Sequence, residues 1–250
     1  MTPRGDWDAA TYDRISDVQV GWALEQLERL PLTGDEIVLD AGCGSGRVTA
    51  ELADRLPRGR VYGVDASPAM VEHARAALAE RAIVVCQDLV ELDLPEPVDA
   101  VFSNATFHWI HDHDALFAAL AGALQPGGRL VAQCGGRGNI DAFRRAADDV
   151  AGEPEFAPYF EAWQRPWTYA DAGQTAGRLE RAGFTEIRTW LEPKRVLTDR
   201  PFVKTVCLLR HLDPLPEKLR DRFVDRVIER GGNPVVLDYV RLNLTARKAT

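Results

Sequence analysis

Apolar positions in the first 135 residues follow two alternating patterns. In the first, short runs of consecutive apolar residues are bounded by glycine, proline or charged residues, which is typical of strands buried on both faces of a sheet. In the second, apolar residues recur at every fourth position, as Val48, Leu52 and Leu56 do, which predicts helices with one apolar face. Strands that alternate with helices predict an α/β fold with a parallel sheet. We expect these strands at 37–41, 61–65, 82–86, 99–104 and 129–133.

The pattern loosens after residue 135. Val240 and Leu242 alternate with Arg241 and Asn243, which predicts an antiparallel strand near the C-terminus. Aromatic residues are dense between 153 and 169, and a stretch so rich in aromatics outside the sheet favours a pocket or lid for an apolar molecule. Further helices are expected at 140–150, 172–182, 198–211 and around 219–227, and a further strand at 184–191.

Composition and charge limit the possible partners. The chain has 250 residues, 46% of them hydrophobic, which suffices for one large domain spanning 1–250. The net charge of −8 and the lack of any Lys/Arg run argue against a nucleic-acid or anionic-membrane partner. The four cysteines show no C-x-x-C spacing, and neither a signal-peptide apolar region nor a run approaching membrane length occurs. We therefore expect a cytoplasmic protein, as a monomer or weak homodimer.

A glycine-rich turn follows the first strand and carries the clearest chemical signal. Its glycines, Gly42, Gly44 and Gly46, come at every second position after Asp40, so backbone N–H groups can approach a bound nucleotide-like molecule. A dinucleotide-binding turn would need a glycine where this chain has Arg47, and the lysine of a Walker loop is absent. An acidic residue at the end of the strand favours a cationic ligand over a pyrophosphate.

This Asp-x-Gly-x-Gly-x-Gly turn resembles that of the class I S-adenosylmethionine-dependent methyltransferases. The resemblance covers about the first 135 residues and includes a second acid, Asp65, at the end of the next strand. It implies S-adenosylmethionine as cofactor, with Asp40, Gly42 and Gly44 at the methionyl end and Asp65 on the ribose hydroxyls. Asp88 and Leu89 would then face the adenine, Asn104 the methionyl ammonium, and Ala66 would also contact the cofactor.

The resemblance is strongest to the trans-aconitate methyltransferase branch. A helical lead-in over 7–30 contains Trp7, Tyr12 and Gln19, a pattern similar to the N-terminal lid of that branch, although aromatic residues at this spacing are also typical of a core. Tyr12 and Gln19 would contact the cofactor and Trp7 the substrate. His108-Trp109 stands where the branch has Gln-Trp, so His108 is a candidate general base or hydrogen-bond donor.

The resemblance also implies the overall architecture. We expect a Rossmann-like sheet of seven mostly parallel strands with an antiparallel C-terminal strand pair. Residues 1–135 would form the cofactor-binding core, and two insertions, 136–170 and 196–231, a helical cap on the acceptor side.

Several functions stay open at this point. The resemblance favours O-methylation of a small organic acid, with Trp109, Arg137 and Trp163 as further substrate-binding residues and Arg14, Arg144 and Arg195 as weaker anion-binding candidates. The aromatic stretch favours instead a bulkier, apolar acceptor, methylated on O, N or C with His108 as base. A NAD-dependent oxidoreductase and a non-catalytic cofactor-binding protein are the alternatives of another class.

A metal site is disfavoured. His108, His111 and His113 alternate with Asp112 and Asp114 on one turn, but at no recognised ligand spacing. Asp114 is better explained as the N-cap of the following helix.

Overall fold

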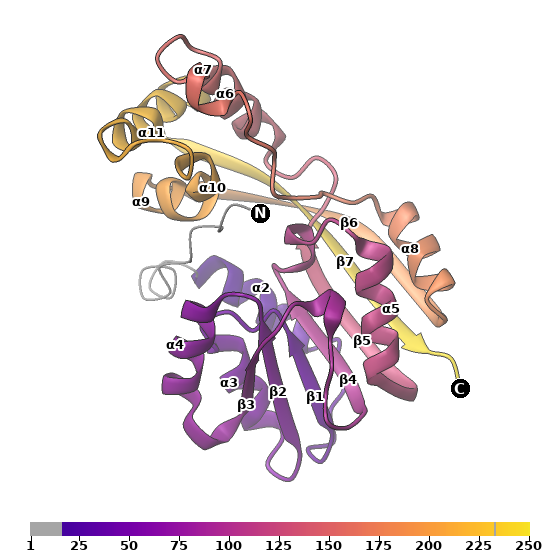
Figure 1. Cartoon of the computed structure of the whole chain (residues 1–250). Coiled ribbons are helices and arrows are strands. Elements are labelled where there is room, and N and C mark those ends of the chain that lie inside the picture. The colour runs from indigo at the N-terminus through magenta and orange to yellow at the C-terminus, as the bar shows by residue number, and fades with distance from the viewer. Residues whose placement is uncertain (1–16, 233) are drawn as a thin grey trace.

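The computed structural model describes residues 17–232 and 234–250; the side chains of residues 17 and 18 are not described. Its centre is a seven-stranded sheet in the order β3-β2-β1-β4-β5-β7-β6 (Figure 1). The first five strands of that order run parallel, and β7 runs antiparallel to both of its neighbours. The strands are β1 (Ile37–Ala41), β2 (Arg60–Asp65), β3 (Ile83–Cys86), β4 (Val98–Asn104), β5 (Leu124–Gly135), β6 (Phe184–Thr198) and β7 (Val235–Lys248). The predicted fold class is confirmed.

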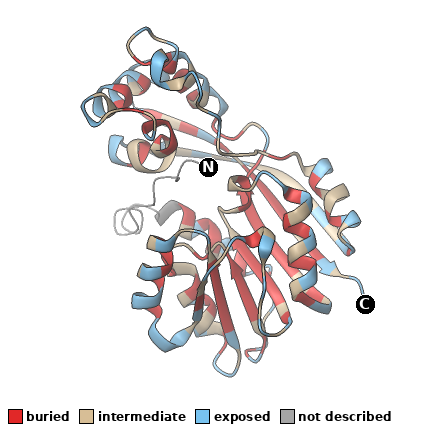
Figure 2. Cartoon of the chain, viewed as in Figure 1, coloured by how far each residue is buried: buried red, intermediate tan, exposed pale blue. Residues whose placement is uncertain are grey.

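Helices cover both faces of the sheet. One apolar cluster joins β1, β4 and β5 to α5 (His113–Ala123) and α8 (Ala172–Arg181). On the other face lie α2 (Asp17–Leu27) and α3 (Arg47–Arg55), and α4 (Pro68–Leu78) packs there on β3. The central strands are buried on both sides (Figure 2), which explains their continuous apolar runs.

Short helices complete the core. Single turns of 3₁₀ helix occur at η1 (Ala79–Arg81), η2 (Leu89–Glu91) and η3 (Phe107–Trp109). The last two directly follow β3 and β4 in the chain, at the carboxyl ends where open α/β sheets bind ligands.

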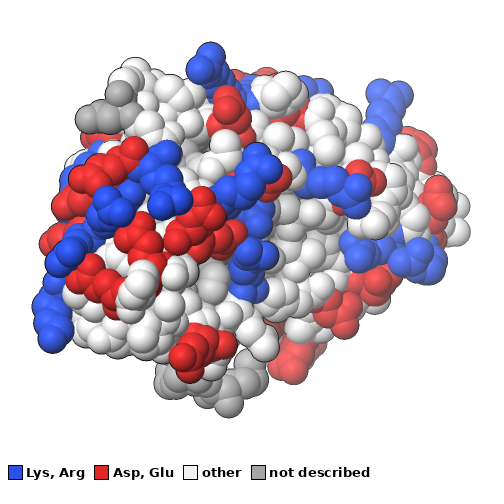
Figure 3. All heavy atoms as spheres, turned by 90° about the horizontal axis from the view of Figure 1, so that it is seen from above, with Lys and Arg blue, Asp and Glu red and all other residues white. Residues whose placement is uncertain are grey.

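A separate helical layer, the cap, lies above these carboxyl ends (Figure 1). It consists of α6 (Asp141–Ala151), α7 (Ala157–Phe160), α9 (Arg200–Phe202), the π-helical η4 (Val203–Cys207), α10 (Leu209–Leu212) and α11 (Glu217–Gly231). Both insertions expected from the sequence contribute to it, and they share one apolar cluster with the upper part of β7. Ion pairs connect α11 to residues 149–153 within the cap. Seen from above, the surface of the molecule carries interspersed charges of both signs (Figure 3).

The structure differs from the predicted elements in three places. Strands β6 and β7 extend to Thr198 and begin at Val235, because their upper halves form a two-stranded ribbon that buries Val235, Leu237 and Tyr239 against the cap. The helix expected at 198–211 is broken into α9, η4 and α10. A π-helical turn contains an extra residue, and the spacing of apolar residues in an α-helix does not predict it.

The third difference concerns the start of α5. Asp112, not Asp114, is the N-cap, and its Oδ1 accepts a hydrogen bond from the N–H of Ala115 at 2.9 Å. Asp114 lies inside the helix and forms ion pairs with Arg181 and Arg178 of α8, at 2.6 and 3.4 Å. The prediction for Asp114 was wrong because two aspartates flank His113, and only the tertiary partner separates their roles.

No helix in the described part of the chain combines the length and apolarity needed to span a bilayer.

Candidate active site

The glycine turn has the backbone conformation that its sequence predicts. Gly42, Gly44 and Gly46 have φ angles of +86°, +52° and +89°, which L side chains rarely adopt. A Cβ at Gly42 would lie 2.1 Å from Oγ1 of Thr106, so this glycine permits close packing of the turn on the end of β4. A Cβ at Gly44 would meet nothing within 4 Å, because Gly44 borders open space.

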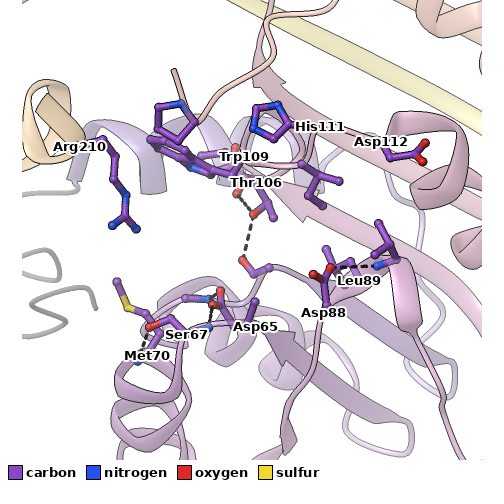
Figure 4. Close-up of a pocket in the computed structure, with 18 of the residues that line it drawn as sticks. Asp65, Ser67, Met70, Asp88, Leu89, Thr106, Trp109, His111, Asp112 and Arg210 are labelled. Atoms are coloured by element: carbon purple, nitrogen blue, oxygen red, sulfur yellow. Dashed lines mark hydrogen bonds between the residues drawn. The ribbon is translucent and has the colours of Figure 1, made fainter. Parts of the chain in front are cut away.

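That open space is a cavity of about 560 Å³ (Figure 4). Asp65 lies on its floor, with Oδ2 accepting a hydrogen bond from the N–H of Gly44 at 3.0 Å and Oδ1 one from the N–H of Ser67 at 2.9 Å. Ser67 in turn caps α4, as its Ser-Pro sequence indicates. The cavity is lined further by Ala66, Met70, Asp88, Leu89, Asn104, Thr106, Trp109, His111 and Arg210.

The wall formed by β3 and η2 holds Asp88 and Leu89. Asp88 is the N-cap of η2 and accepts a hydrogen bond from the N–H of Val90 at 3.2 Å. Leu89 is buried beside it and presents an apolar surface to the same cavity. A flat ring bound at this wall could therefore contact the apolar side chain of Leu89 and donate a hydrogen bond to the carboxylate of Asp88.

A smaller cavity of about 60 Å³ continues behind the glycine turn and shares Gly42, Gly44 and Asn104 with the large one. Two of the side chains that line it carry an acceptor oxygen without a donor. Among the described residues, Oε1 of Gln19 and Oδ1 of Asn104 are buried without a hydrogen-bond partner. Asp40 accepts a hydrogen bond from Thr49 Oγ1 at 2.7 Å, and burial, followed by repulsion from Asp65, raises the pKa of Asp40 to about 7. These groups suit a cationic ligand that donates hydrogen bonds.

A third cavity, of about 70 Å³, lies under the cap and shares Ala105, Trp109 and Arg210 with the large one. Three arginines line it: Arg144 from α6, Arg210 from α10 and Arg241 from β7. None of its described lining residues is an aspartate or glutamate. In Figure 4 the guanidinium of Arg210 points from the cap toward the wall that carries Met70. The cavity can therefore hold an anion.

The arginines are held in place by aromatic rings and polar side chains. Arg144 lies over the rings of Tyr169 and Trp167, at 5.1 and 5.7 Å from their centroids, and donates to Asp141 at 3.0 Å. Arg241 is 3% exposed and lies 4.9 Å from the centroid of Trp22. Such contacts fix the orientation of a guanidinium.

Comparisons with known proteins agree with this geometry. A profile of the methyltransferase domain family matches residues 38–128. The trans-aconitate 2-methyltransferase of Methylobacterium nodulans is 31% identical over 268 aligned residues, which cover 97% of this chain and 98% of that protein. That of Escherichia coli is 41% identical over 133 residues, about half of each chain.

The chain belongs to the class I S-adenosylmethionine-dependent methyltransferases, in the trans-aconitate methyltransferase branch. Its cofactor is S-adenosylmethionine. The same fold occurs in the phosphoethanolamine N-methyltransferase 2 of Haemonchus contortus, solved with S-adenosylhomocysteine, at a TM-score of 0.62 and 21% identity over 97% of this chain and 57% of that one. The predicted family and cofactor are confirmed.

His108 of this methyltransferase lies in the cavity of the three arginines. It is 7% exposed, and its Nδ1 accepts a long hydrogen bond, 3.4 Å, from the N–H of Gly135. Burial, with the charges of Arg241 and His113, lowers its pKa well below 6.5. The imidazole is therefore neutral at pH 7 with its proton on Nε2, so Nε2–H is the donor available to a molecule in the cavity.

The other predicted site residues divide into three groups. Gln19, Ala66, Asp88, Leu89 and Asn104 line the cavities together with the glycine turn, Asp40, Asp65 and Trp109. Arg137, Trp163 and Arg195 line none of these three cavities. Arg137 and Arg195 are mostly exposed and lie 3.7 Å from Asp171 and Asp238, and Trp163 packs inside the cap. Trp7, Tyr12 and Arg14 lie outside the described residues.

Sequence reasoning missed Arg210 and Arg241. Arg241 is at a polar position of an alternating strand, and such positions usually face solvent, but Trp22 of α2 lies on its guanidinium and Arg241 is buried. Arg210 comes just after the π-helical turn that the apolar pattern does not reveal. The sequence contained one signal that could have identified Arg241: it is a polar residue on a strand, near the end of the sheet where ligands bind.

Proposed function

We propose that this enzyme transfers the methyl group of S-adenosylmethionine to a carboxylate oxygen of a small di- or tricarboxylic acid. The observation that carries the proposal is the convergence of Arg144, Arg210 and Arg241 on one cavity that opens to the cofactor side. The described lining of this cavity carries three guanidinium groups and no carboxylate, which favours an anionic acceptor over an apolar or cationic one. The trans-aconitate 2-methyltransferases named above support the same substrate class.

The cofactor's parts find partners along the joined cavities. Asp65 has lone pairs left for the two ribose hydroxyls, beyond its bonds to Gly44 and Ser67. Asp88 and Leu89 receive the adenine. Asp40, Asn104 and Gln19 supply the acceptor oxygens that the methionyl ammonium needs, and Ala66, Gly42 and Gly44 leave space for the chain between them.

The chemistry requires alignment more than acid–base assistance. The acceptor oxygen forms the new bond to the methyl carbon of the bound sulfonium as the carbon–sulfur bond breaks, and the electron pair stays on sulfur. The arginines hold the acceptor's carboxylates, and His108 Nε2–H donates to one of their oxygens. The cap covers the cavity with Trp167 and Tyr169 and keeps water out. Such positioning contributes about 7–11 kcal/mol of barrier reduction in favourable cases.

A general base has no task in this reaction, because a carboxylate is ionised before it reacts. This separates the proposal from the alternative of a bulkier, less acidic acceptor with His108 as base. A cavity lined by three arginines, with a histidine that carries its proton on the available nitrogen, gives that alternative no support.

The test is turnover on a panel of acceptors that differ in carboxylate number. We expect methyl ester from trans-aconitate, less from fumarate and least from crotonate, detected by mass spectrometry with S-adenosylhomocysteine as coproduct. Arg144→Met, Arg210→Met and Arg241→Met should each lower kcat/KM for trans-aconitate by about 10²-fold, because each leaves a carboxylate without its partner.

Arg137→Met is the matched control, because this arginine is 63% exposed and lies outside the cavities. Its kcat/KM should equal that of the wild type. Turnover of a neutral phenol or an amine, with none on any of the three acids, would overturn the proposal.

A further inference from the structure

Three amide side chains lie side by side across the sheet, next to the proposed acceptor cavity. Strand register pairs Asn104 of β4 with Gln133 of β5, and Gln133 with Asn243 of β7. Gln133 and Asn243 are 1% and 0% exposed. Polar side chains so deeply buried are destabilising unless every hydrogen bond is made, and an apolar residue would serve the sheet as well. We therefore expect a functional role of Gln133 and Asn243 in the contacts that they make.

Two of these amides, Gln133 and Asn243, form a continuous chain of hydrogen bonds that ends on an acceptor-side arginine. Asn243 Nδ2 donates to Glu192 Oε2 at 3.3 Å, Gln133 Nε2 donates to Asn243 Oδ1 at 2.8 Å, and Arg241 Nε donates to Gln133 Oε1 at 3.2 Å. The side chain of Arg241 lines the cavity of about 70 Å³. Gln133 therefore fixes the position of Arg241 through the hydrogen bond from Nε.

The direction of this chain is set at its far end. Ionised Glu192 can only accept hydrogen bonds, so Asn243 must turn its NH₂ group toward it and its oxygen toward Gln133. Gln133 must then donate to Asn243, which leaves its oxygen for Arg241. Lys194 lies 3.0 Å from Glu192 and 2.8 Å from Glu25 of α2, and so anchors the carboxylate. An exposed ion pair thereby orients a buried amide two strands away.

We propose that Gln133 is a positioning residue for the acceptor, acting through Arg241, and that Glu192 and Asn243 fix the amide in the orientation this requires. The inference rests on the proposed function. A neutral amide oxygen holds Nε without adding a negative charge beside the guanidinium. A carboxylate in the same place would form an ion pair with Arg241 and compete with the acceptor.

The experiment measures the Kd of trans-aconitate by calorimetry on protein saturated with S-adenosylhomocysteine. Gln133→Met keeps the volume and removes the acceptor oxygen, and we expect Kd to rise about 10-fold. Gln133→Glu should raise it about 100-fold, because it adds a competing charge. The Kd of S-adenosylhomocysteine, measured separately, should stay unchanged in both variants.

Two further variants keep the test decisive if a buried substitution impairs folding. Glu192 lies on the edge strand with its side chain about one third exposed, so Glu192→Gln should fold normally. Its neutral amide no longer dictates the orientation of Asn243, and Kd for trans-aconitate should rise about 3-fold. Thr245→Val, two residues along β7 from Asn243 and outside the chain of hydrogen bonds, should leave Kd unchanged.

A double-mutant cycle decides whether Gln133 acts through Arg241. In the Arg241→Met background, Gln133→Met should cause no further loss of trans-aconitate affinity. An equal loss in both backgrounds, or unchanged Kd in both Gln133 variants and in Glu192→Gln, would overturn this inference alone. A wild-type protein that binds no carboxylic acid would overturn the proposed function instead.

Discussion

His108 differs from the glutamine of its branch, yet both side chains can present an N–H donor to the same space. The hydrogen bond from Gly135 to Nδ1 leaves the imidazole proton on Nε2, and burial beside Arg241 keeps the ring neutral. At the scale of single residues, the site therefore depends on which atoms donate and which accept. In the proposed site, Asp40, Asn104 and Gln19 supply acceptors at the cofactor end, whereas the arginines and His108 supply donors at the acceptor end.

This distinction predicts the outcome of two substitutions at His108. His108→Gln keeps an N–H donor, so kcat on trans-aconitate should stay within a few-fold of the wild type. His108→Phe removes the donor and should lower kcat about 10²-fold. Steady-state kinetics between pH 6 and 8 would show the difference, and titration of His108 should add no limb to the wild-type rate in this range, because the pKa of His108 lies well below 6.5. If glutamine were as damaging as phenylalanine, the histidine would be acting as a base.

At the scale of elements, the cap has a core of its own that includes an unusual histidine. His211 of α10 is 1% exposed and stacks among Trp163, Trp167 and Phe223, with centroid distances of 4.8 to 6.2 Å. Neither of its ring nitrogens has a hydrogen-bond partner among the described residues. Burial, with the charges of Arg144 and Arg165, lowers its pKa to about 3.

His211 should therefore make the protein sensitive to acid. Between pH 3 and 6.5 the unfolded chain binds a proton at this histidine that the folded protein does not, so the free energy of unfolding falls as the pH falls through this range. His211→Phe removes both the proton site and two unsatisfied nitrogens. It should raise the free energy of unfolding by about 1–3 kcal/mol at pH 5, and by less at pH 8.

Urea unfolding of the two proteins at both pH values measures this effect. His73→Gln, at a partly exposed histidine of α4, is the control and should unfold like the wild type at each pH. Equal acid sensitivity in His211→Phe and wild type would contradict the assignment.

At the scale of the whole molecule, the two longest strands connect the cap to the core. β6 and β7 have 15 and 14 residues, and their lower halves belong to the main sheet while their upper halves carry the cap. The net charge of −8 does not describe the cavity under the cap, whose described lining holds three arginines and no carboxylate. Because Arg144 and Arg210 are both on cap helices, the proposed binding of the acceptor would stabilise the cap.

Continuous strands predict that cap and core unfold together. Phe223→Ala removes a fully buried ring that lies 5.2 Å from Phe156 and 5.5 Å from Phe160, and should lower the free energy of unfolding by about 3–5 kcal/mol. The loss should appear as an earlier single transition, with circular dichroism and tryptophan fluorescence coinciding. Two separate transitions would mean that the cap unfolds as an independent unit.

The sequence by itself determined the parallel half of the sheet and the cofactor turn. Both rest on local rules: consecutive apolar residues indicate buried strands, and glycines at 42, 44 and 46 meet a backbone requirement within a few residues. The placement of Asp65 followed from the same rules, since the ends of adjacent parallel strands meet at one edge of the sheet.

Only the tertiary structure decided the acceptor side. Arg144, Arg210 and Arg241 come from elements far apart in the chain, and the contact between Arg241 and Gln133 depends on the register of β5 against β7. Register and cap docking are set by the packing of the whole chain, and a shift of one residue would turn Arg241 to the other face. This is why local patterns led to the exposed Arg137 as well as to Arg144, which lines the cavity, while Arg210 and Arg241 became visible only in the fold.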